Sequence, residues 1–188
     1  MRKFVLAACC ALICGTAFAK PLPIGTLAPD NLGKTLAGQK VTVSGLHGKV
    51  VVISFWATWC KYCLREMPEL DGLQVIANKR HLPLQVVEID LRQQHIVFVR
   101  ATRLLMPRLP GLLMTWDRTG ALAHSFGVGN ALPAMIILNR DGSVADIKIG
   151  YADSELKPLA AEITRLLNEP APPPESTQAV ARSPTTIE

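Results

Sequence analysis

The sequence predicts an α/β domain in which helices flank both faces of a mixed β-sheet. Patterns typical of strands and of helices alternate between residues 50 and 126. Two strand patterns joined by a turn follow over 134–150 and indicate a β-hairpin. An amphipathic pattern over 154–168 indicates a final helix. Strand–helix alternation that ends in a hairpin is typical of a mixed sheet covered by helices.

The predicted strands are rich in β-branched and aromatic residues. The run Val50–Trp56 carries no charged residue, so we expect it to be the buried central strand. Residues 20–38 are punctuated by proline and glycine and are expected to be irregular chain lying over the domain. Asn139–Gly142 indicates the hairpin turn. The predicted strands cover 40–44, 50–56, 84–91, 112–116, 134–138 and 143–150.

The predicted helices have apolar residues that recur every three or four positions. The first follows Cys60 and runs to about Asn78. We expect a kink at Pro68, because proline removes a backbone hydrogen bond. The predicted helices cover 60–78, 93–106, 121–126 and 154–168.

Residues 1–19 are interpreted as a cleavable export signal. Arg2 and Lys3 give a positive start, residues 4–16 are apolar or small, and Ala17–Ala19 has the A-x-A form of a cleavage site. The apolar run is shorter than the roughly 20 residues that a membrane-spanning helix needs. No later segment is long and apolar enough to span a membrane either. Cleavage therefore predicts a periplasmic protein without a transmembrane segment.

The exported chain is expected to be one domain followed by a tail. The domain covers 20–168, and residues 169–188 are predicted to be disordered because they are rich in proline, serine and threonine. Loss of Arg2 and Lys3 with the export signal lowers the formal net charge from +5 to +3. This excess is too small to indicate nucleic-acid binding.

Only Cys60 and Cys63 remain of the five cysteines once residues 1–19 are removed. Leu6–Cys9 resembles a lipoprotein-processing motif, but it leaves few apolar residues ahead of Cys9, so lipid anchoring there is disfavoured. A disulfide between Cys60 and Cys63 would close too short a loop to stabilise the fold much, which disfavours a purely structural role. We therefore interpret the pair as a redox site.

The CxxC pair directly follows the predicted central strand and begins the predicted helix. Unpaired N–H groups and the helix dipole at this position stabilise a thiolate on Cys60. Such a thiolate attacks a disulfide, and Cys63 can then resolve the mixed disulfide. Lys61 would favour the Cys60 thiolate through its charge. Glu66 lies one turn later, where it would either raise thiol pKa values or point into solvent as a surface side chain.

The run from Phe55 to Pro68 reads FWATWCxxCxxExP. It resembles the TlpA/ResA/CcmG-like group of exported disulfide reductases at every fixed position of the motif. Leu132-Pro133 before an apolar strand is similar to the cis-proline loop of that group. The resemblance covers about residues 25–168 and implies a thioredoxin fold.

The resemblance also implies roles for single residues. Cys60 would be the exposed attacking thiol and Cys63 the buried resolving thiol. Pro133 would be cis beside the cysteines, which leaves the backbone of Leu132 free to pair with a client chain. The residues expected to contact the client are Trp59, Tyr62, Leu132 and Pro133.

Ser54 departs from the pattern of cytoplasmic thioredoxins, which carry a buried aspartate at this place. That aspartate assists proton removal from the second cysteine. A serine hydroxyl is not a base near neutral pH, so another group or water must act here. Lys61-Tyr62 also lacks the proline that is common between the cysteines of the reducing branch.

We therefore expect an extracytoplasmic thiol–disulfide oxidoreductase that reduces client proteins and uses no cofactor beyond the Cys60–Cys63 couple. The resemblance implies apocytochrome c or metal-site assembly proteins as clients and a membrane thiol donor for re-reduction. One alternative is an oxidase or isomerase that uses the same site. Another is a copper or zinc module in which His47 or His124 joins the cysteines, although structural zinc usually needs four ligands.

Overall fold

The computed structural model describes residues 22–150 and 156–170. The predicted export signal over 1–19 and residues 171–188 of the predicted tail lie outside the described residues. The strands are β1 (Asn31–Lys34), β2 (Lys40–Thr42), β3 (Val50–Trp56), β4 (Leu84–Leu91), β5 (Leu113–Asp117), β6 (Ala134–Leu138) and β7 (Val144–Ile149). The helices are the 3-10 helix η1 (Ser44–Leu46) and the α-helices α1 (Lys61–Lys79), α2 (His95–Leu105), α3 (Ala121–Ser125) and α4 (Leu156–Asn168).

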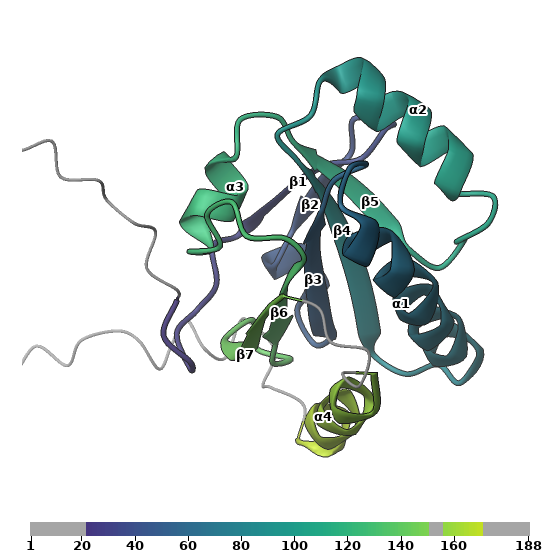
Figure 1. Cartoon of the computed structure of the whole chain (residues 1–188). Helices are drawn as coiled ribbons and strands as arrows, with labels where there is room; N and C mark the ends of the chain where they lie inside the picture. Colours follow the sequence, from purple (N-terminus) through teal and green to yellow (C-terminus); the bar gives the residue numbers. More distant parts are fainter. Residues whose placement is uncertain (1–21, 151–155, 171–188) are drawn as a thin grey trace, which may run out of the picture.

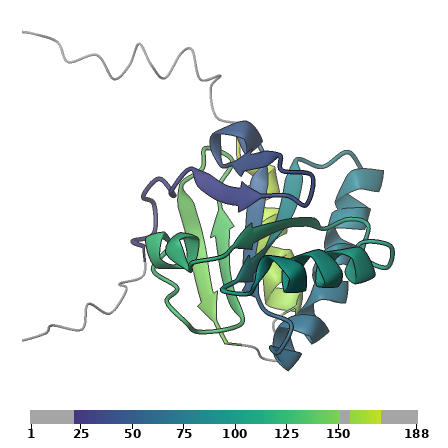
Figure 2. The same ribbon diagram turned by 90° about the horizontal axis from the view of Figure 1, so that it is seen from above.

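Within the described residues, seven strands form one mixed sheet in the order β2-β1-β5-β4-β3-β6-β7. The central strands β3, β4 and β5 are parallel neighbours, whereas the pairings of β1, β2, β6 and β7 are antiparallel. Helices α1 and α2 lie to one side of the sheet and α3 to the other (Figure 1). Helix α4 packs on the face that carries α1 (Figure 2). The predicted α/β class, with helices on both faces, is confirmed.

The central strand β3 is buried along its whole length. Val52 and Trp56 belong to the apolar cluster that also contains residues of α1, α2 and α4. Ile53 and Phe55 belong to the cluster that contains residues of α3. Because side chains alternate along a strand, Ser54 faces the α1 side.

The prediction of irregular chain over 20–38 is wrong for Asn31–Lys34, which forms β1. This strand has no β-branched residue, so its local sequence gives little indication of a strand. Tertiary contacts hold it instead, because it pairs with both β2 and β5 and the Thr115 hydroxyl donates to the Leu32 carbonyl oxygen at 2.6 Å. At Gly33, where φ is +93°, a Cβ atom would lie 3.2 Å from the Thr115 Cβ atom. This position therefore favours glycine.

Most other element boundaries lie within one or two residues of the predicted ones. Strands β4 and β6 have the predicted bounds. The strand predicted over 40–44 ends at Thr42, where η1 follows. The start predicted for the last helix at residue 154 lies outside the described residues. No helix within 22–150 or 156–170 is long and apolar enough to cross a membrane.

Candidate redox site

Cys60 and Cys63 form a disulfide at the start of α1. Cys60 is the N-cap residue of the helix, and its Sγ atom accepts the backbone N–H of Cys63 at 3.2 Å. The backbone N–H of Cys60 donates to the Ala57 carbonyl oxygen at 2.9 Å, which makes a tight turn between β3 and α1. The structure thus places the pair at a helix N-terminus, as the sequence predicted. A thiolate formed there on reduction is stabilised by the helix dipole.

Both cysteines are buried in the disulfide form: Cys60 is 6% exposed and Cys63 is 2% exposed. The expectation of an exposed Cys60 is therefore wrong for this form. Cys60 belongs to the apolar cluster that contains Trp56 and Ala57, and Leu132 packs against this cluster. Cys60 is still the more accessible of the two sulfur-bearing residues. A client disulfide must therefore approach Cys60 closely.

The Leu132–Pro133 peptide bond is cis. Strand β6 begins at the next residue, Ala134, which pairs with Phe55, so the cis-proline loop lies beside the end of β3. The Pro133 carbonyl oxygen accepts the backbone N–H of Gly150 at 2.9 Å. The backbone of Leu132 makes no such bond to another described backbone group. Its N–H and C=O groups are therefore available to a bound chain.

Three large apolar side chains beside the disulfide are exposed, namely Trp59 at 68%, Tyr62 and Leu64. Trp59 precedes Cys60, and Tyr62 lies between the two cysteines. Exposed apolar side chains gathered in one place mark an interaction surface. Lys61 is exposed as well, so solvent screens the effect of its charge on a thiolate.

Glu66 is only 8% exposed, although it lies one turn after Cys63 on α1. The alternative of a solvated surface side chain is therefore wrong. Position 66 lies on the buried side of α1 together with Cys63, Met67 and Leu70. A buried negative charge so close to the dithiol disfavours a thiolate through like-charge repulsion.

Glu88 on β4 is a buried acid that the active-site motif does not indicate. It is fully buried and pairs in the β3–β4 register with Ser54. Burial raises the pKa of Glu88 well above its ordinary value, the charge of Glu66 raises it further, and the Ser54 hydroxyl lowers it. Neither carboxyl oxygen has a partner with full hydrogen-bond geometry, so Ser54 acts as a nearby dipole. The sequence carries one indication of these buried acids, because Glu88 and Asp90 interrupt an otherwise apolar run that predicts a buried strand.

Asp90 is connected by hydrogen bonds to the active-site motif. The Gln93 side chain donates to Asp90 and accepts from the Thr58 hydroxyl, two residues before Cys60. The Trp116 indole N–H donates to the Gln93 carbonyl oxygen at 3.0 Å. Burial raises the pKa of Asp90 to about 6, although the hydrogen bond from Gln93 acts in the opposite direction.

The cis-proline loop is tied to the end of β4 by Arg92. Its guanidinium donates to the Asn130 side-chain oxygen, and its backbone N–H donates to the Asp117 carbonyl oxygen at 2.8 Å. Arg92 has a φ of +56°, which is uncommon for a residue other than glycine. The guanidinium lies where a Cβ atom on Gly120 would be. Gly120 therefore leaves room for the contact between Arg92 and Asn130.

The residues of the metal-binding alternative are not brought together. Cys60 and Cys63 are bonded to each other, His124 lies in α3 on the opposite face of the sheet, and His47 follows η1. Among the described residues, no group of three or more His, Cys, Asp or Glu side chains could hold a metal ion.

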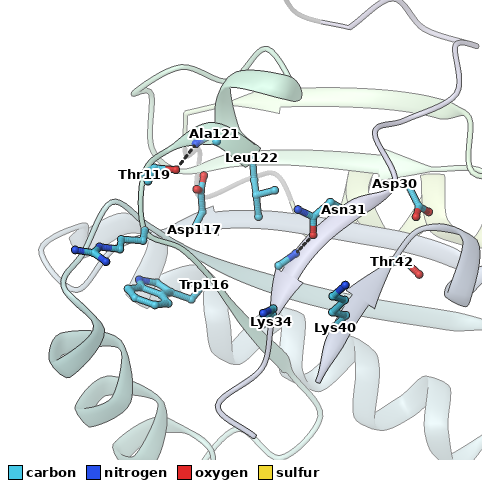
Figure 3. Close-up of a pocket in the computed structure, with 12 residues that line it drawn as sticks. Asp30, Asn31, Lys34, Lys40, Thr42, Trp116, Asp117, Thr119, Ala121 and Leu122 are labelled. Carbon is cyan, nitrogen blue, oxygen red and sulfur yellow. Dashed lines mark hydrogen bonds between the residues drawn. The ribbon is translucent and has the colours of Figure 1, made fainter. Parts of the chain in front are cut away.

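A cavity of about 510 Å³ lies at the edge of the sheet formed by β2, and it is lined by residues of β1, β2 and β5 (Figure 3). Lys34 and Lys40 line it. Asp117 also lines it and accepts the backbone N–H groups of Gly120 and Ala123 at the start of α3. No residue of the active-site motif lines this cavity, so it is separate from the redox site.

Comparison with known proteins agrees with this geometry. The model of the AhpC/TSA family matches residues 24–147. Thioredoxin-like protein YneN from Bacillus subtilis (strain 168) is 50% identical over 133 residues, which cover 67% of this chain and 71% of the relative. Thiol-disulfide oxidoreductase ResA from Geobacillus thermodenitrificans (strain NG80-2) is 29% identical over 133 residues, which cover 70% of this chain and 72% of the relative.

A solved structure supports the fold assignment. The thiol:disulfide interchange protein, a thioredoxin family protein, from Chlorobium tepidum TLS has a TM-score of 0.63 at 21% identity. The match covers 77% of this chain and 97% of that protein. The chain belongs to the AhpC/TSA family, and it is a thiol–disulfide oxidoreductase with a thioredoxin fold of the TlpA/ResA/CcmG-like kind.

Proposed function

We propose that this oxidoreductase acts outside the cytoplasm and reduces disulfides in client proteins. The observation that carries the proposal is the surface around Cys60. Trp59 and Tyr62, which are next to Cys60 and between the two cysteines in the sequence, are exposed, and the cis-proline loop contributes the backbone groups of Leu132. An extended client segment can pair with these backbone groups while apolar side chains hold it.

The reaction is a pair of thiol–disulfide exchanges. The Cys60 thiolate attacks one sulfur of the client disulfide, and the other client sulfur leaves with the electron pair and takes a proton. Cys63 then loses its proton and attacks the Cys60 sulfur, so the second client sulfur leaves as a thiolate. That client thiolate takes a proton from water, so the client gains two electrons and two protons in total, and the Cys60–Cys63 disulfide is restored.

Buried acids around the dithiol support the reducing direction. A strong oxidant of this kind is one whose reduced form is stabilised, as by a well-stabilised thiolate. Here the carboxyl groups of Glu66 and Glu88 are buried on the side of the dithiol, and a negative charge on either disfavours a thiolate. The charge of Lys61 acts in the opposite sense, but it is exposed and screened.

The proposed location outside the cytoplasm indicates the class of client and the class of electron donor. Without a glutathione pool, re-reduction of the disulfide requires a dithiol donor in the membrane. Apocytochrome c before haem attachment, or a metal-site assembly protein, supplies a pair of thiols that must be kept reduced. The predicted cleavage after Ala19 is tested by the mass of the exported chain, which should begin at Lys20.

The reduction potential decides the direction. Equilibration of the mature protein with dithiothreitol or glutathione should give a value near the roughly −270 mV of thioredoxin. A value above about −180 mV would instead favour the oxidase or isomerase alternative. Clients are captured with Cys63→Ser, which leaves the mixed disulfide on Cys60 unresolved, and Cys60→Ser is the matched control that should capture none. Ready capture by the control alone would reverse the roles of the two cysteines.

A further inference from the structure

Glu88 has no packing role that requires a carboxyl group. It is fully buried in the middle of β4, and neither of its carboxyl oxygens has a hydrogen-bond partner. Its register neighbours are Ser54 on β3 and Met114 on β5, neither of which carries a charge. An apolar side chain would fill the same space without the penalty of burying a polar group. The carboxyl group therefore needs an explanation in chemistry.

The carboxyl group of Glu88 lies on the face of the sheet that α1 covers. Alternation along β4 places Glu88 on the same side as Leu84 and Val86, which belong to the apolar cluster that contains Cys63. The charge of Glu66, one turn after Cys63 on α1, acts on Glu88. Charges in such a core are poorly screened, so a charge on the dithiol acts on Glu88 as well.

The charged and titratable groups on this side of the sheet are few. Helix α1 contributes Cys63 and Glu66, and β4 itself contributes Asp90 two residues further along. Strand β7 contributes Lys148, which stands in the cross-strand row of Glu88 through Met135 and Ser54. The buried residues that α2 and α4 contribute to this cluster, such as Phe98 and Leu159, are apolar. Lys148 is paired with Asp146 at 2.9 Å, so carboxyl groups still outnumber cationic groups on this face.

We propose that Glu88 is the proton-binding group of the redox site, a positioning residue whose proton occupancy changes with the charge on the dithiol. The inference deepens the oxidoreductase activity and does not depend on its direction. Cys63 must lose its proton before it attacks Cys60, and its burial limits contact with water. Ser54 is not a base at neutral pH. A thiolate beside Glu88 raises its proton affinity, so ionised Glu88 takes the proton that Cys63 gives up as it attacks Cys60. Once the uncharged disulfide has formed, Glu88 releases that proton to water.

Coupling of this kind has a visible consequence in the reduced protein. Two interacting groups lose their protons in two macroscopic steps that belong to the pair. Thiolate formation in the wild-type protein should therefore follow pH in two steps. Once Glu88 ionises, its negative charge holds back the thiolate, so the second step lies at higher pH.

The test measures thiolate formation in the reduced mature protein between pH 5 and 10. The rate of alkylation by iodoacetamide reports the fraction of thiolate at each pH. Glu88→Gln keeps the size of the side chain but cannot ionise. It should abolish the step that Glu88 causes and give about tenfold more thiolate at pH values above that step, which corresponds to one pKa unit of coupling. Ser54→Ala removes the hydroxyl that favours ionised Glu88, so Glu88 should ionise at higher pH and the break between the two steps should move with it.

A buried carboxylate elsewhere provides the control. Asp117 is also buried, but it accepts two backbone N–H groups at the start of α3. Asp117→Asn should leave the two-step profile unchanged even if it lowers stability. An unchanged profile in Glu88→Gln, or an equal change in Asp117→Asn, would overturn the proposal.

Infrared difference spectroscopy provides a second readout that needs no client. The oxidised-minus-reduced spectrum of the wild-type protein should contain a protonated carboxyl band that is missing in Glu88→Gln. Absence of this band from the wild-type spectrum would also overturn the proposal. Both measurements are independent of the reduction potential, so a high potential would refute the reductase direction and leave this inference standing.

Discussion

Replacement of Asp90 by asparagine should stabilise the protein at neutral pH and have little effect in acid. Burial raises the pKa of Asp90 from 3.8 to about 6. The folded chain therefore holds a proton on Asp90 that the unfolded chain releases, and ionisation at higher pH opposes folding. The stability contributed by the raised pKa is fully present below about pH 4 and is lost as the pH rises through 6.

The magnitude follows from the difference between these two pKa values. At 1.36 kcal/mol per unit, the shift corresponds to about 3 kcal/mol. This is an upper bound for the gain from Asp90→Asn at pH 7 to 8, because asparagine resembles the protonated acid and keeps the oxygen that accepts from Gln93. Glu88 titrates on the same strand, but its contribution largely cancels when mutant and wild type are compared at each pH.

The assay is urea unfolding of the oxidised protein at pH 4, 5, 6, 7 and 8, with tryptophan fluorescence as the signal that reports unfolding. The difference in free energy of unfolding between Asp90→Asn and wild type should be near zero at pH 4 and grow until about pH 7. Asp117→Asn is the matched control, and it should destabilise the fold at pH 7 because its carboxylate accepts two backbone N–H groups. A difference between Asp90→Asn and wild type that does not vary with pH would refute the argument.

Three further substitutions separate stability from client handling. Gly120→Ala should lower the free energy of unfolding by about 1–3 kcal/mol, because φ is +79° and the new Cβ would displace Arg92; an unchanged urea midpoint would contradict this. Arg92→Ala frees the loop that carries Asn130, so kcat/KM for a protein disulfide should fall severalfold while the urea midpoint changes little; equal losses in both would indicate a structural role only. Trp59→Ala should raise KM for a protein disulfide but not for a small aromatic disulfide, because the indole is 68% exposed; equal effects on the two substrates would exclude a role in client binding.

The parts of the fold that the sequence predicts well are those determined by local pattern. The bounds of β4 and β6 follow from short apolar runs between turns. The CxxC pair lies at the start of α1 because a strand without charges precedes it and a helical pattern follows it. Strand β1 is different, since Asn31–Lys34 becomes a strand only through its pairing with neighbours distant in sequence.

The buried acids of the site depend on contacts that the sequence does not contain. Helical spacing leaves open whether Glu66 faces the sheet or solvent, and only the packing of α1 on the sheet decides it. The pairing of Ser54 with Glu88 depends on the register between β3 and β4, which is a non-local property. The one local sign was the presence of Glu88 and Asp90 at alternate positions of an otherwise apolar strand.

The distribution of polar residues along β4 supports a functional reason for these acids. On the face under α1, the first half of the strand carries Leu84 and Val86, and the second half, nearer the active-site motif, carries Glu88 and Asp90. The opposite face is apolar throughout its buried length. Buried carboxyl groups without full hydrogen bonding oppose folding, and natural chains retain such groups mainly where function requires them. These two acids lie only on the face under α1 and only in the half of β4 that pairs with the end of β3 leading to Cys60. The redox chemistry of Cys60 and Cys63 is therefore the best reason for their presence.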